Sequence, residues 1–497
     1  MKKDLAQLLA ERGSLDGTAA KLRIVLALTW PSVLAQMSNI VMEYIDAAMV
    51  GSLGAVQSAA IGLVATSTWL LWGLGVAVCT GFSVQAAHRI GAGDDEGARK
   101  VLRQSILVVG VFGCILGIFG VGIGHRLPVW LGGEAEVAAP AGDYFVIFAG
   151  GMPLLCLTFL SVSMLRSSGN MAVPGIVNVA MCAMDVIFNF FLIFPSRNIS
   201  RFGTELFMPG AGLGVAGAAV GTVLAYATGG VYLYYYMFRR SKHLCRTFGG
   251  IRFSDALKLD RHVFARARAI CWPVAVERMV MGGAQVVITA IVAPLGNAAI
   301  AANAFAVTAE SLCYAPGYGV NDAASTLVGQ SIGAGRKNTA RSFARICVIC
   351  GMSIMGALGV VMWILAPEMM AMFSTNADII SLGTTALRTE AWAEPMFGAA
   401  IVTYGVFVGA GYTVVPAAIN FSSIWVVRIT LSALLAPSLG LYGVWLAMCI
   451  ELCVRGGVFL ICLVAGRWLR KAKAIGDTDK DAQEVAEGPS VQNDIVV

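Results

Sequence analysis

The stretch Trp30–Gly54, WPSVLAQMSNIVMEYIDAAMVGSLG, is an apolar segment of helix length that carries two acids, Glu43 and Asp46. Because the acids are three residues apart, a helix would place both on one face. A carboxylate in such a segment is costly unless it faces a wet cavity or a partner, so both acids are candidates for function. The stretch also recurs without a gap at an offset of 242 residues, in the pairs Trp30-Pro31 and Trp272-Pro273, Val50 and Val292, and Leu53-Gly54 and Leu295-Gly296.

The composition places the chain among polytopic membrane proteins. Of its 497 residues, 58% are hydrophobic and 13% are charged, and the mean hydropathy of +0.76 is too high for one or two soluble domains. Crossing a bilayer takes about 20 apolar residues per helix. We therefore predict an all-α membrane protein with twelve transmembrane helices, at about 24–50, 57–83, 101–124, 141–165, 173–194, 213–238, 269–294, 299–329, 344–366, 388–410, 416–436 and 440–466.

The distribution of Lys and Arg predicts the orientation. If both termini are cytoplasmic, the inner segments hold 28 of the 35 Lys and Arg residues, and the outer loops hold Arg126, Arg197 and Arg201. We therefore expect both termini in the cytoplasm. The net charge of +6 follows mostly from this bias. No basic surface with interleaved aromatic residues indicates nucleic-acid binding.

The internal repeat divides the chain into two six-helix lobes. Its register continues through the motif IGAG, at 90–93 and 332–335, as far as Pro195 and Pro437, after which the first half carries about sixteen extra residues as a longer outer loop, SRNISRFGTELFMPGA. Because six is even, both copies enter the membrane in the same direction, which predicts a pseudo-two-fold axis along the membrane normal. The predicted regions are a cytoplasmic amphipathic N-terminus at 1–23, an N-terminal lobe at 24–238, a basic cytoplasmic linker at 239–268, a C-terminal lobe at 269–466 and a disordered cytoplasmic tail at 467–497.

Polar residues in the fifth predicted helix form a stripe that ends near the depth of Asp46. Asn178, Asp185 and Asn189 are spaced by seven and four residues, so they lie on one helical face. With Glu43 and Asp46 they form a predicted ion-coupling site in the N-terminal lobe. Two acids sharing a partly desolvated pocket suit a proton, and the same acids with amide oxygens suit Na⁺. The alternative is that Asp46 and Asp185 only hydrogen-bond neighbouring helices.

The second half has its own acids within predicted helices. Glu310 and Glu394 lie at comparable depth without an evident local cation, so they form the second candidate site. Glu451 and Arg455 stand four residues apart and are expected to pair as structural glue. The acids of the C-terminal lobe that we consider are Glu277, Glu310, Glu390 and Glu394.

Aromatic residues are candidates to line a substrate cavity, although most aromatic residues at helical spacing only pack. The candidates are Trp72, Tyr144, Tyr314 and Trp392, together with Trp69, Tyr318, Tyr404 and Trp425. The twelve cysteines lie almost all in apolar helices, and the four histidines lie at helix ends or in loops. We therefore expect no metal site beyond a bound Na⁺, and no cofactor.

Several short patterns resemble one family over most of the chain, about 22–466. The patterns are Pro31, Asp46 and VGSLG in the first helix, IGAGR after the eighth, PxxxE from Pro273 to Glu277 in the seventh, and GVW from Gly443 to Trp445 in the twelfth. Their order and spacing resemble the multidrug and toxic-compound extrusion (MATE) family. The resemblance implies a twelve-helix antiporter of a bacterial inner membrane that exchanges organic cations and other toxic compounds for H⁺ or Na⁺.

The resemblance also implies roles for single residues. Asp46 falls on the acid of the family's first helix, Pro31 on the bend of that helix, and Glu277 on an acid found in one bacterial subset. In the fifth helix many relatives have Asn followed four residues later by Asp. Here the order is reversed, with Asp185 before Asn189, so the carboxylate lies about one turn further inward.

Three functions fit these observations to different degrees. The first is antiport of cationic amphiphiles by a monomer, and the second is flipping of an anionic lipid-linked precursor, as in other members of the superfamily. We count as intramembrane charges the eight acids Glu43, Asp46, Asp185, Glu277, Glu310, Glu390, Glu394 and Glu451 and the four arginines Arg278, Arg388, Arg428 and Arg455. This acidic interior favours cations. The third, an integral-membrane enzyme, needs a nucleophile with its base or a metal cluster, and the sequence shows neither.

Overall fold

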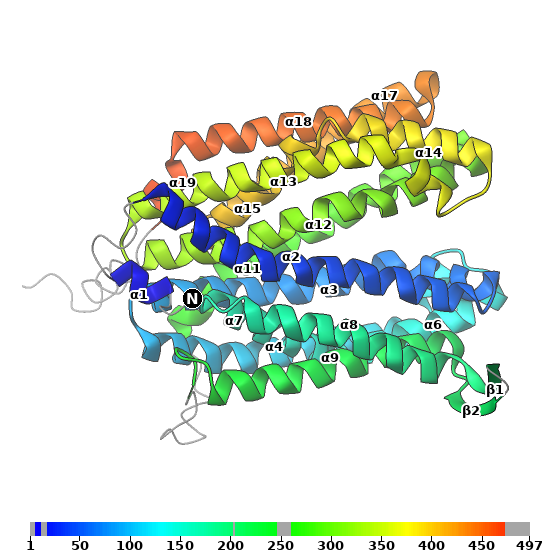
Figure 1. Ribbon diagram of the computed structural model, residues 1–497, viewed down its shortest axis with the longest axis horizontal. Helices are drawn as coiled ribbons and strands as arrows, with labels where there is room; N and C mark the ends of the chain where they lie inside the picture. Colours follow the sequence, from blue (N-terminus) through cyan, green and yellow to red (C-terminus); the bar gives the residue numbers. More distant parts are fainter. Residues whose placement is uncertain (1–4, 11–16, 202–203, 246–259, 473–497) are drawn as a thin grey trace, which may run out of the picture.

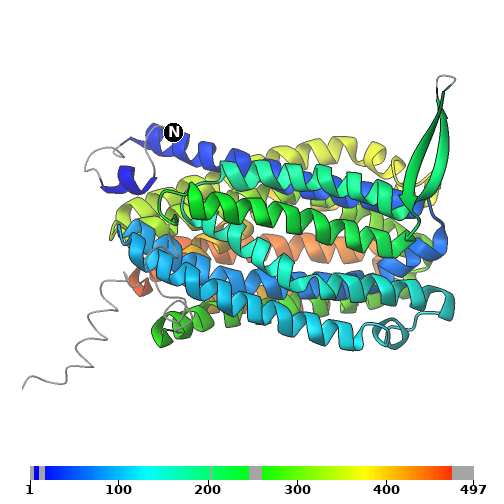
Figure 2. The ribbon, with the colours of Figure 1, turned by 90° about the horizontal axis from the view of Figure 1, so that it is seen from below.

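The computed structural model describes residues 5–10, 17–201, 204–245 and 260–472. Its long helices run side by side, and the two ends of the molecule differ (Figures 1 and 2). One end, here the terminal end, carries the short helices α1 (Leu5–Ala10) and α19 (Arg467–Lys471). The opposite end, here the hairpin end, carries the strands β1 (Pro195–Arg201) and β2 (Thr204–Ala211).

The predicted all-α polytopic fold is confirmed. The described residues contain ten helices long and apolar enough to cross a membrane and two bent helix pairs, which together make twelve spans. The spans of the first half are α2 (Thr18–Gly51), α3 (Ala55–Gly91), α4 (Asp95–Ile123), α6 with α7 (Ala135–Gly150 and Met152–Ser167), α8 (Ala172–Ile193) and α9 (Gly214–Arg239). Those of the second half are α11 (Arg261–Val292), α12 (Asn297–Gly333), α13 (Lys337–Ala371), α14 with α15 (Ala377–Glu390 and Glu394–Gly409), α16 (Val414–Ser422), which continues through η2 (Ser423–Arg428) into α17 (Ile429–Leu439), and α18 (Leu441–Ala465). The short helices α5 (Leu127–Trp130) and η1 (Ala293–Leu295) lie in connections.

Two spans predicted as single helices are bent helix pairs in the structure. The pair α6 and α7 bends by 50°, and the pair α14 and α15 bends by 60°. Pro153 and Pro395 each follow directly after the start of the second helix of a pair. Proline lacks an N–H group and its ring clashes with the carbonyl four residues earlier, so the preceding helix ends there.

The repeat holds to single-residue accuracy in the described helices. Five helices of the first half begin 242 residues before their counterparts, and Gly93 and Gly335 both take positive φ angles, of 78° and 70°, in the IGAG turns. The five pairs of starting residues are Ala55 and Asn297, Asp95 and Lys337, Ala135 and Ala377, Met152 and Glu394, and Ala172 and Val414. The structure thus has two six-helix lobes of the same design, related by a pseudo-two-fold axis.

The axis passes through a seam at the terminal end, where α3 of the first lobe crosses α12 of the second. Nε2 of His88 donates to the carbonyl oxygen of Gly409 at 2.8 Å, and Nε2 of Gln330 donates to that of Ser167 at 2.7 Å. Each bond is the 242-residue image of the other. Beside them, Gly91 and Gly333 pack against the opposite backbone so closely that neither has room for a Cβ atom.

The sixteen-residue insertion is more regular than the predicted outer loop. It forms the antiparallel strands β1 and β2, with Arg197 paired with Met208 and Arg201 with Thr204 in backbone register. The hairpin projects beyond the helices at its end of the molecule (Figure 2). A hairpin satisfies its own backbone groups, which an irregular loop would leave to water.

The predicted boundaries of the terminal regions need correction. Helix α11 begins at Arg261, inside the predicted linker 239–268, and helix α19 lies inside the predicted disordered tail 467–497. Trp468 of α19 is 1% exposed, and its ring centroid lies 6.1 Å from that of Phe407. Apolar contact therefore orders the start of the tail. Residues 1–4, 11–16, 246–259 and 473–497 of these predicted regions lie outside the described residues.

Candidate functional site

The first candidate site joins α2 and α8 in the N-terminal lobe. The side-chain amide of Asn189 donates both hydrogens to carboxylates, one to Asp46 Oδ1 at 2.8 Å and one to Asp185 Oδ2 at 3.0 Å. The carboxyl groups of Asp46 and Asp185 also lie within hydrogen-bonding reach of each other. The structure therefore brings together the two acids and the amide that the sequence predicted as the core of an ion site.

Burial makes this arrangement chemically demanding. Asp185 and Asn189 are 0% exposed, and Asp185 Oδ1 and Asn189 Oδ1 have no hydrogen-bond partner among the described residues. Within the same described part of the chain, no Lys or Arg acts on either acid. A buried carboxylate next to the half-buried carboxylate of Asp46, without a basic partner, needs a proton or a metal cation between them.

Glu43 lies beside this site and also borders the other lobe. It is exposed, and it is within electrostatic range of Asp46, of Tyr144 in the N-terminal lobe and of Tyr314 in the C-terminal lobe. Glu43 is thus the acid of the N-terminal cluster that is open to a ligand between the lobes.

Two other predicted residues hold α8 against α2. The amide of Asn178 donates to the carbonyl oxygen of Ala35 at 3.0 Å and to Asn39 Oδ1 at 2.6 Å. Gly175 packs directly on the backbone of Pro31, across which α2 continues as one helix. Asn178 therefore contacts α2 two turns away from Asp185, and it fixes the packing of the helix that carries Asp46.

Glu277 of α11 lies in the C-terminal lobe at the place that Ala35, the partner of Asn178, has in the N-terminal lobe. Its carboxylate accepts from Tyr404 Oη at 2.6 Å and from the amide of Asn420 at 2.5 Å. Asn420 is the repeat image of Asn178, and Glu277 is the image of Ala35. The same asparagine thus binds a backbone carbonyl in one lobe and a buried carboxylate in the other.

The other acids of the C-terminal lobe form one buried cluster around the bend between α14 and α15. Glu310 is 3% exposed, while Glu390, Glu394 and Glu451 are 0% exposed. Glu390 ends α14 and Glu394 begins α15, so they flank the break in the helix. In the described part of the chain, neither oxygen of either carboxylate at this break has a hydrogen-bond partner.

Arginines enter this cluster from α18 and from the η2 segment that precedes α17. Nε of Arg455 lies 3.1 Å from Glu451 Oε1, so the predicted pair forms. The expectation that Glu310 lacks a nearby cation is wrong, because both Arg428 and Arg455 act on it electrostatically. Four carboxylates against two guanidinium groups leave two negative charges, which protons or a bound cation must balance.

The predicted cavity aromatics fall into different surroundings. The ring centroids of Trp72 and Phe159 lie 4.3 Å apart inside the N-terminal lobe. Those of Tyr314 and Phe397 lie 5.9 Å apart beside the acid cluster of the other lobe. Trp392 is 75% exposed at the bend between α14 and α15. Tyr144, Tyr314 and Tyr404 are thus candidates that lie next to acids.

The repeat does not extend to the chemistry of the two sites. Asp46, Asp185 and Asn189 have the apolar images Ile288, Val427 and Leu431 in the second half. Conversely, Glu310, Glu390 and Glu394 have the images Thr68, Phe148 and Met152 in the first half. Each lobe therefore carries its own acid site on a shared scaffold.

Asp322 of α12 is an acid that was not among the residues predicted from the sequence. Its Oδ2 accepts from Arg166 Nη1 of α7 at 2.6 Å and from the amide of Gln36 of α2 at 3.5 Å. Both partners belong to the other lobe, so Asp322 ties the lobes together near the terminal end. Arg166 lies in the last turn of α7, where the sequence indicates only an inner-loop charge, so the pairing had no local signal.

One family model covers most of both lobes. The MatE family model matches residues 31–191 and 273–434, one segment in each lobe. The chain belongs to the MatE family. Its two matched segments begin 242 residues apart, as the internal repeat does. The predicted recognition of a transporter family, and not of an enzyme family, is confirmed.

Relatives of this MatE protein carry names that refer to drug resistance. The Probable multidrug resistance protein NorM of Thermotoga maritima is 24% identical over 433 residues, covering 86% of this chain and 89% of the relative. The Probable multidrug resistance protein NorM of Mesorhizobium japonicum is 26% identical, covering 91% and 94%. The chain thus spans nearly the whole length of these relatives. Its family and its relatives identify it as a multidrug efflux transporter.

Solved structures agree with the fold. A transporter of the MOP superfamily from Pyrococcus furiosus superposes with a TM-score of 0.83 at 19% identity, covering 94% of this MatE chain and 99% of the other. The Vibrio cholerae MATE transporter VcmN in its bent form superposes with a TM-score of 0.79 at 17% identity, covering 92% and 98%. The two-lobe architecture of the MatE protein is therefore the architecture of MATE transporters.

Proposed function

We propose that this MatE protein is a secondary active antiporter, which exports cationic or amphiphilic organic compounds in exchange for H⁺ or Na⁺. The observation that carries the proposal is the cluster of half-buried Asp46 with buried Asn189 and Asp185, which has no basic partner among the described residues. Such a cluster is stable with a proton or cation bound and is costly when both acids are ionised and empty. Binding and release of that ion is the step that a gradient can drive.

The substrate class follows from the acids that border both lobes. Glu43 is exposed near Tyr144 and Tyr314, so a negative charge and aromatic faces meet where a cationic compound can bind. An anionic lipid-linked precursor would call for Arg and Lys at this place. The drug-resistance names of the relatives support the same choice.

Alternating access of the lobes is the proposed transport cycle. In the present conformation the terminal end is held shut by the seam around His88 and Gln330 and by the contacts of Asp322 with Arg166 and Gln36. We place this end in the cytoplasm of a bacterium, in line with the positive-inside rule, and treat the protein as a monomer. Opening towards the cytoplasm then requires these bonds between the lobes to break.

Transport into inverted membrane vesicles tests the proposal. We expect uptake of a fluorescent cationic dye such as ethidium when a pH gradient or a Na⁺ gradient is imposed without ATP, and no uptake without a gradient. Which of the two gradients suffices identifies the coupling ion. Uptake that needs ATP, or that proceeds equally in vesicles lacking the protein, would overturn the proposed antiport.

Exchanging Asp185 and Asn189 tests whether the position of the acid selects the ion. The double variant Asp185→Asn with Asn189→Asp keeps the same groups on one face of α8 and moves the charge by about 6 Å along the helix. We expect slower transport with a changed pH dependence or ion preference, because the distance to Asp46 sets how strongly the two carboxylates interact. Unchanged pH and ion profiles would show that Asp185 is structural.

A further inference from the structure

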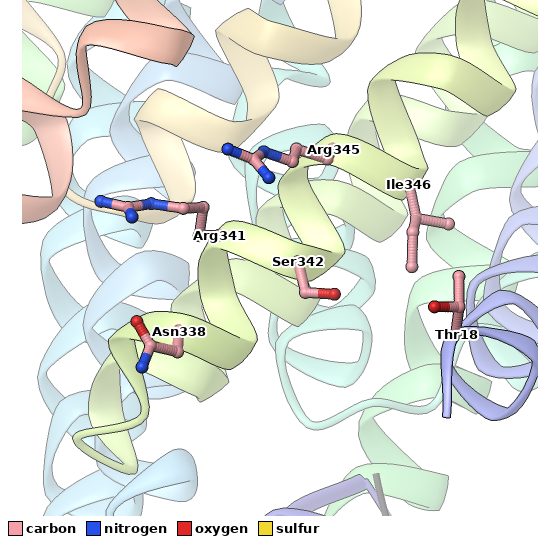
Figure 3. Close-up of a pocket in the computed structure, with 6 residues that line it drawn as sticks. All are labelled: Thr18, Asn338, Arg341, Ser342, Arg345 and Ile346. Carbon is pink, nitrogen blue, oxygen red and sulfur yellow. The ribbon is translucent and has the colours of Figure 1, made fainter. Parts of the chain in front are cut away.

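A second kind of site lies at the terminal end, outside both acid clusters. A pocket of about 400 Å³ is formed by the start of α2 and the first three turns of α13. Figure 3 shows its lining, in which Arg341 and Arg345 lie on successive turns of α13 and Ser342 faces Thr18. The remaining lining residues are Asn338 and Ile346. Because α2 and α13 belong to different lobes, the pocket lies between the lobes.

The basic groups of this pocket are not neutralised by the described protein. Arg341 and Arg345 are exposed, and neither has an ion pair with an acid in the described part of the chain. Nζ of Lys21 adds a third positive charge, held at 3.2 Å from Ser342 Oγ. In Figure 3 both guanidinium groups extend away from Thr18, while Ser342, which holds Lys21, faces Thr18. Three positive charges around one pocket favour an anion.

The repeat offers an internal control for this conclusion. The image of the pocket lies between α11 and α4, where Lys100 occupies the place of Ser342 and Asp260 the place of Thr18. There Nζ of Lys100 lies 2.5 Å from Asp260 Oδ2, and Arg99, the image of Arg341, donates to the carbonyl oxygen of His243 at 3.2 Å.

The surroundings of the image site stabilise the charged form of its carboxylate. The hydrogen bond from Lys100 holds the pKa of Asp260 below its usual value. At the pocket, Thr18 stands where Asp260 supplies this negative charge. The pocket therefore has neither half of that ion pair, because Ser342 replaces Lys100 and Thr18 replaces Asp260. Its positive charges come from Arg341, Arg345 and Lys21, and no acid among the lining residues offsets them.

The surroundings of the pocket decide between a soluble anion and a lipid. Leu22 and Leu26 follow Thr18 at four-residue spacing on α2 and are 39% and 49% exposed. On α13, Ile349 follows Arg345 by four residues and is 62% exposed. Since residues four apart share a helical face, apolar stripes of two membrane-spanning helices lead away from the basic pocket.

We infer that this pocket binds the phosphate headgroup of an anionic phospholipid from the cytoplasmic leaflet. Arg341, Arg345 and Lys21 contact the phosphate, and the acyl chains lie along Leu22, Leu26 and Ile349. The lipid supplies the negative charge that Asp260 supplies on the opposite side. Because it bridges α2 and α13, it stabilises the closed terminal end. The inference rests on the proposed orientation and is independent of the coupling ion.

Thermal unfolding of the purified full-length protein in nanodiscs tests the inference. We expect a higher unfolding temperature with phosphatidylglycerol in the bilayer than with phosphatidylcholine alone, and loss of most of this difference in Arg341→Gln with Arg345→Gln. The matched control is Arg239→Gln with Arg240→Gln, which removes two exposed charges at the end of α9 and keeps the lipid effect. A lipid effect of equal size in both double variants would overturn the inference.

A gain-of-charge variant tests the same idea without removing an arginine. Thr18→Asp reproduces Asp260 at the pocket, so its unfolding temperature in phosphatidylcholine is expected to approach that of the wild type in phosphatidylglycerol. The variant should also respond less to added phosphatidylglycerol. Adding millimolar inorganic phosphate to the protein in phosphatidylcholine tests whether a soluble anion has the same effect. Stabilisation by phosphate equal to that by phosphatidylglycerol would overturn the assignment to a lipid, and so would an unchanged lipid response in Thr18→Asp.

Discussion

Asp46→Asn and Asp185→Asn are each expected to reduce gradient-driven transport to the level of vesicles without the protein. Asparagine keeps the shape of the side chain, and its oxygen can still accept from Asn189, which now donates to Asp46 at 2.8 Å and to Asp185 at 3.0 Å. Folding is therefore expected to survive. What disappears is the second carboxylate, without which the cluster has no excess negative charge for a proton or Na⁺ to balance.

Dye uptake under the driving gradient, normalised to protein in the membrane, is the measurement for this pair. Asp143→Asn serves as the control, since Asp143 is an exposed acid at the hairpin end whose side chain is 59% accessible, and its loss should leave uptake unchanged. Normal uptake in both Asp46→Asn and Asp185→Asn would move the coupling site to the acids of the C-terminal lobe.

Asp322→Asn is expected to open the terminal end. Removing one partner of a desolvated, hydrogen-bonded pair costs about 2 kcal/mol or more, a roughly 30-fold change in an equilibrium constant. We use the lower limit because the side chains of Arg166 and Asp322 are 20% and 24% exposed. The cost falls on the closed conformation alone, because only there does Asp322 join α12 to both α7 and α2.

Maleimide labelling of a cysteine introduced at Ala87 reports this opening. Ala87 is 3% exposed in the seam beside Gly329, so it reacts only when the lobes separate. The background carries replacements of the reactive native cysteines. We expect faster labelling in Asp322→Asn and recovery of the slow rate when the charges are exchanged in Arg166→Asp with Asp322→Arg. Equal labelling rates in wild type and Asp322→Asn would contradict a latch role.

The sequence predicts the scaffold well because its evidence is periodic and redundant. Length and apolarity define the spans, and the 242-residue register ties turns such as Gly93 and Gly335 to the same place in both lobes. The grouping of Asp46, Asp185 and Asn189 could also be predicted, because helical spacing and depth in the membrane can be read from the local sequence. Tertiary contact then only had to place α8 against α2.

Other features depend on contacts that no local pattern contains. The partners of Asp322 come from two helices of the opposite lobe, and the arginines beside Glu310 come from η2 and α18. The bends at Pro153 and Pro395 had a local signal, proline, that span counting ignored. Burial of Trp468 orders α19, whereas the composition of this segment alone indicates a polar tail.

The crossing of α3 and α12 resembles the interface of a homodimer, although both of its halves belong to one chain. In an isologous interface each contact occurs twice, once from each copy, as the bonds of His88 and Gln330 do here. Two identical halves could not have changed one of these residues without changing both. In one chain the two positions can differ, and here they are His at one and Gln at the other, while each side chain bonds to the opposite carbonyl oxygen. A single chain thus permits the two halves to differ at equivalent positions, as their unlike acid clusters do.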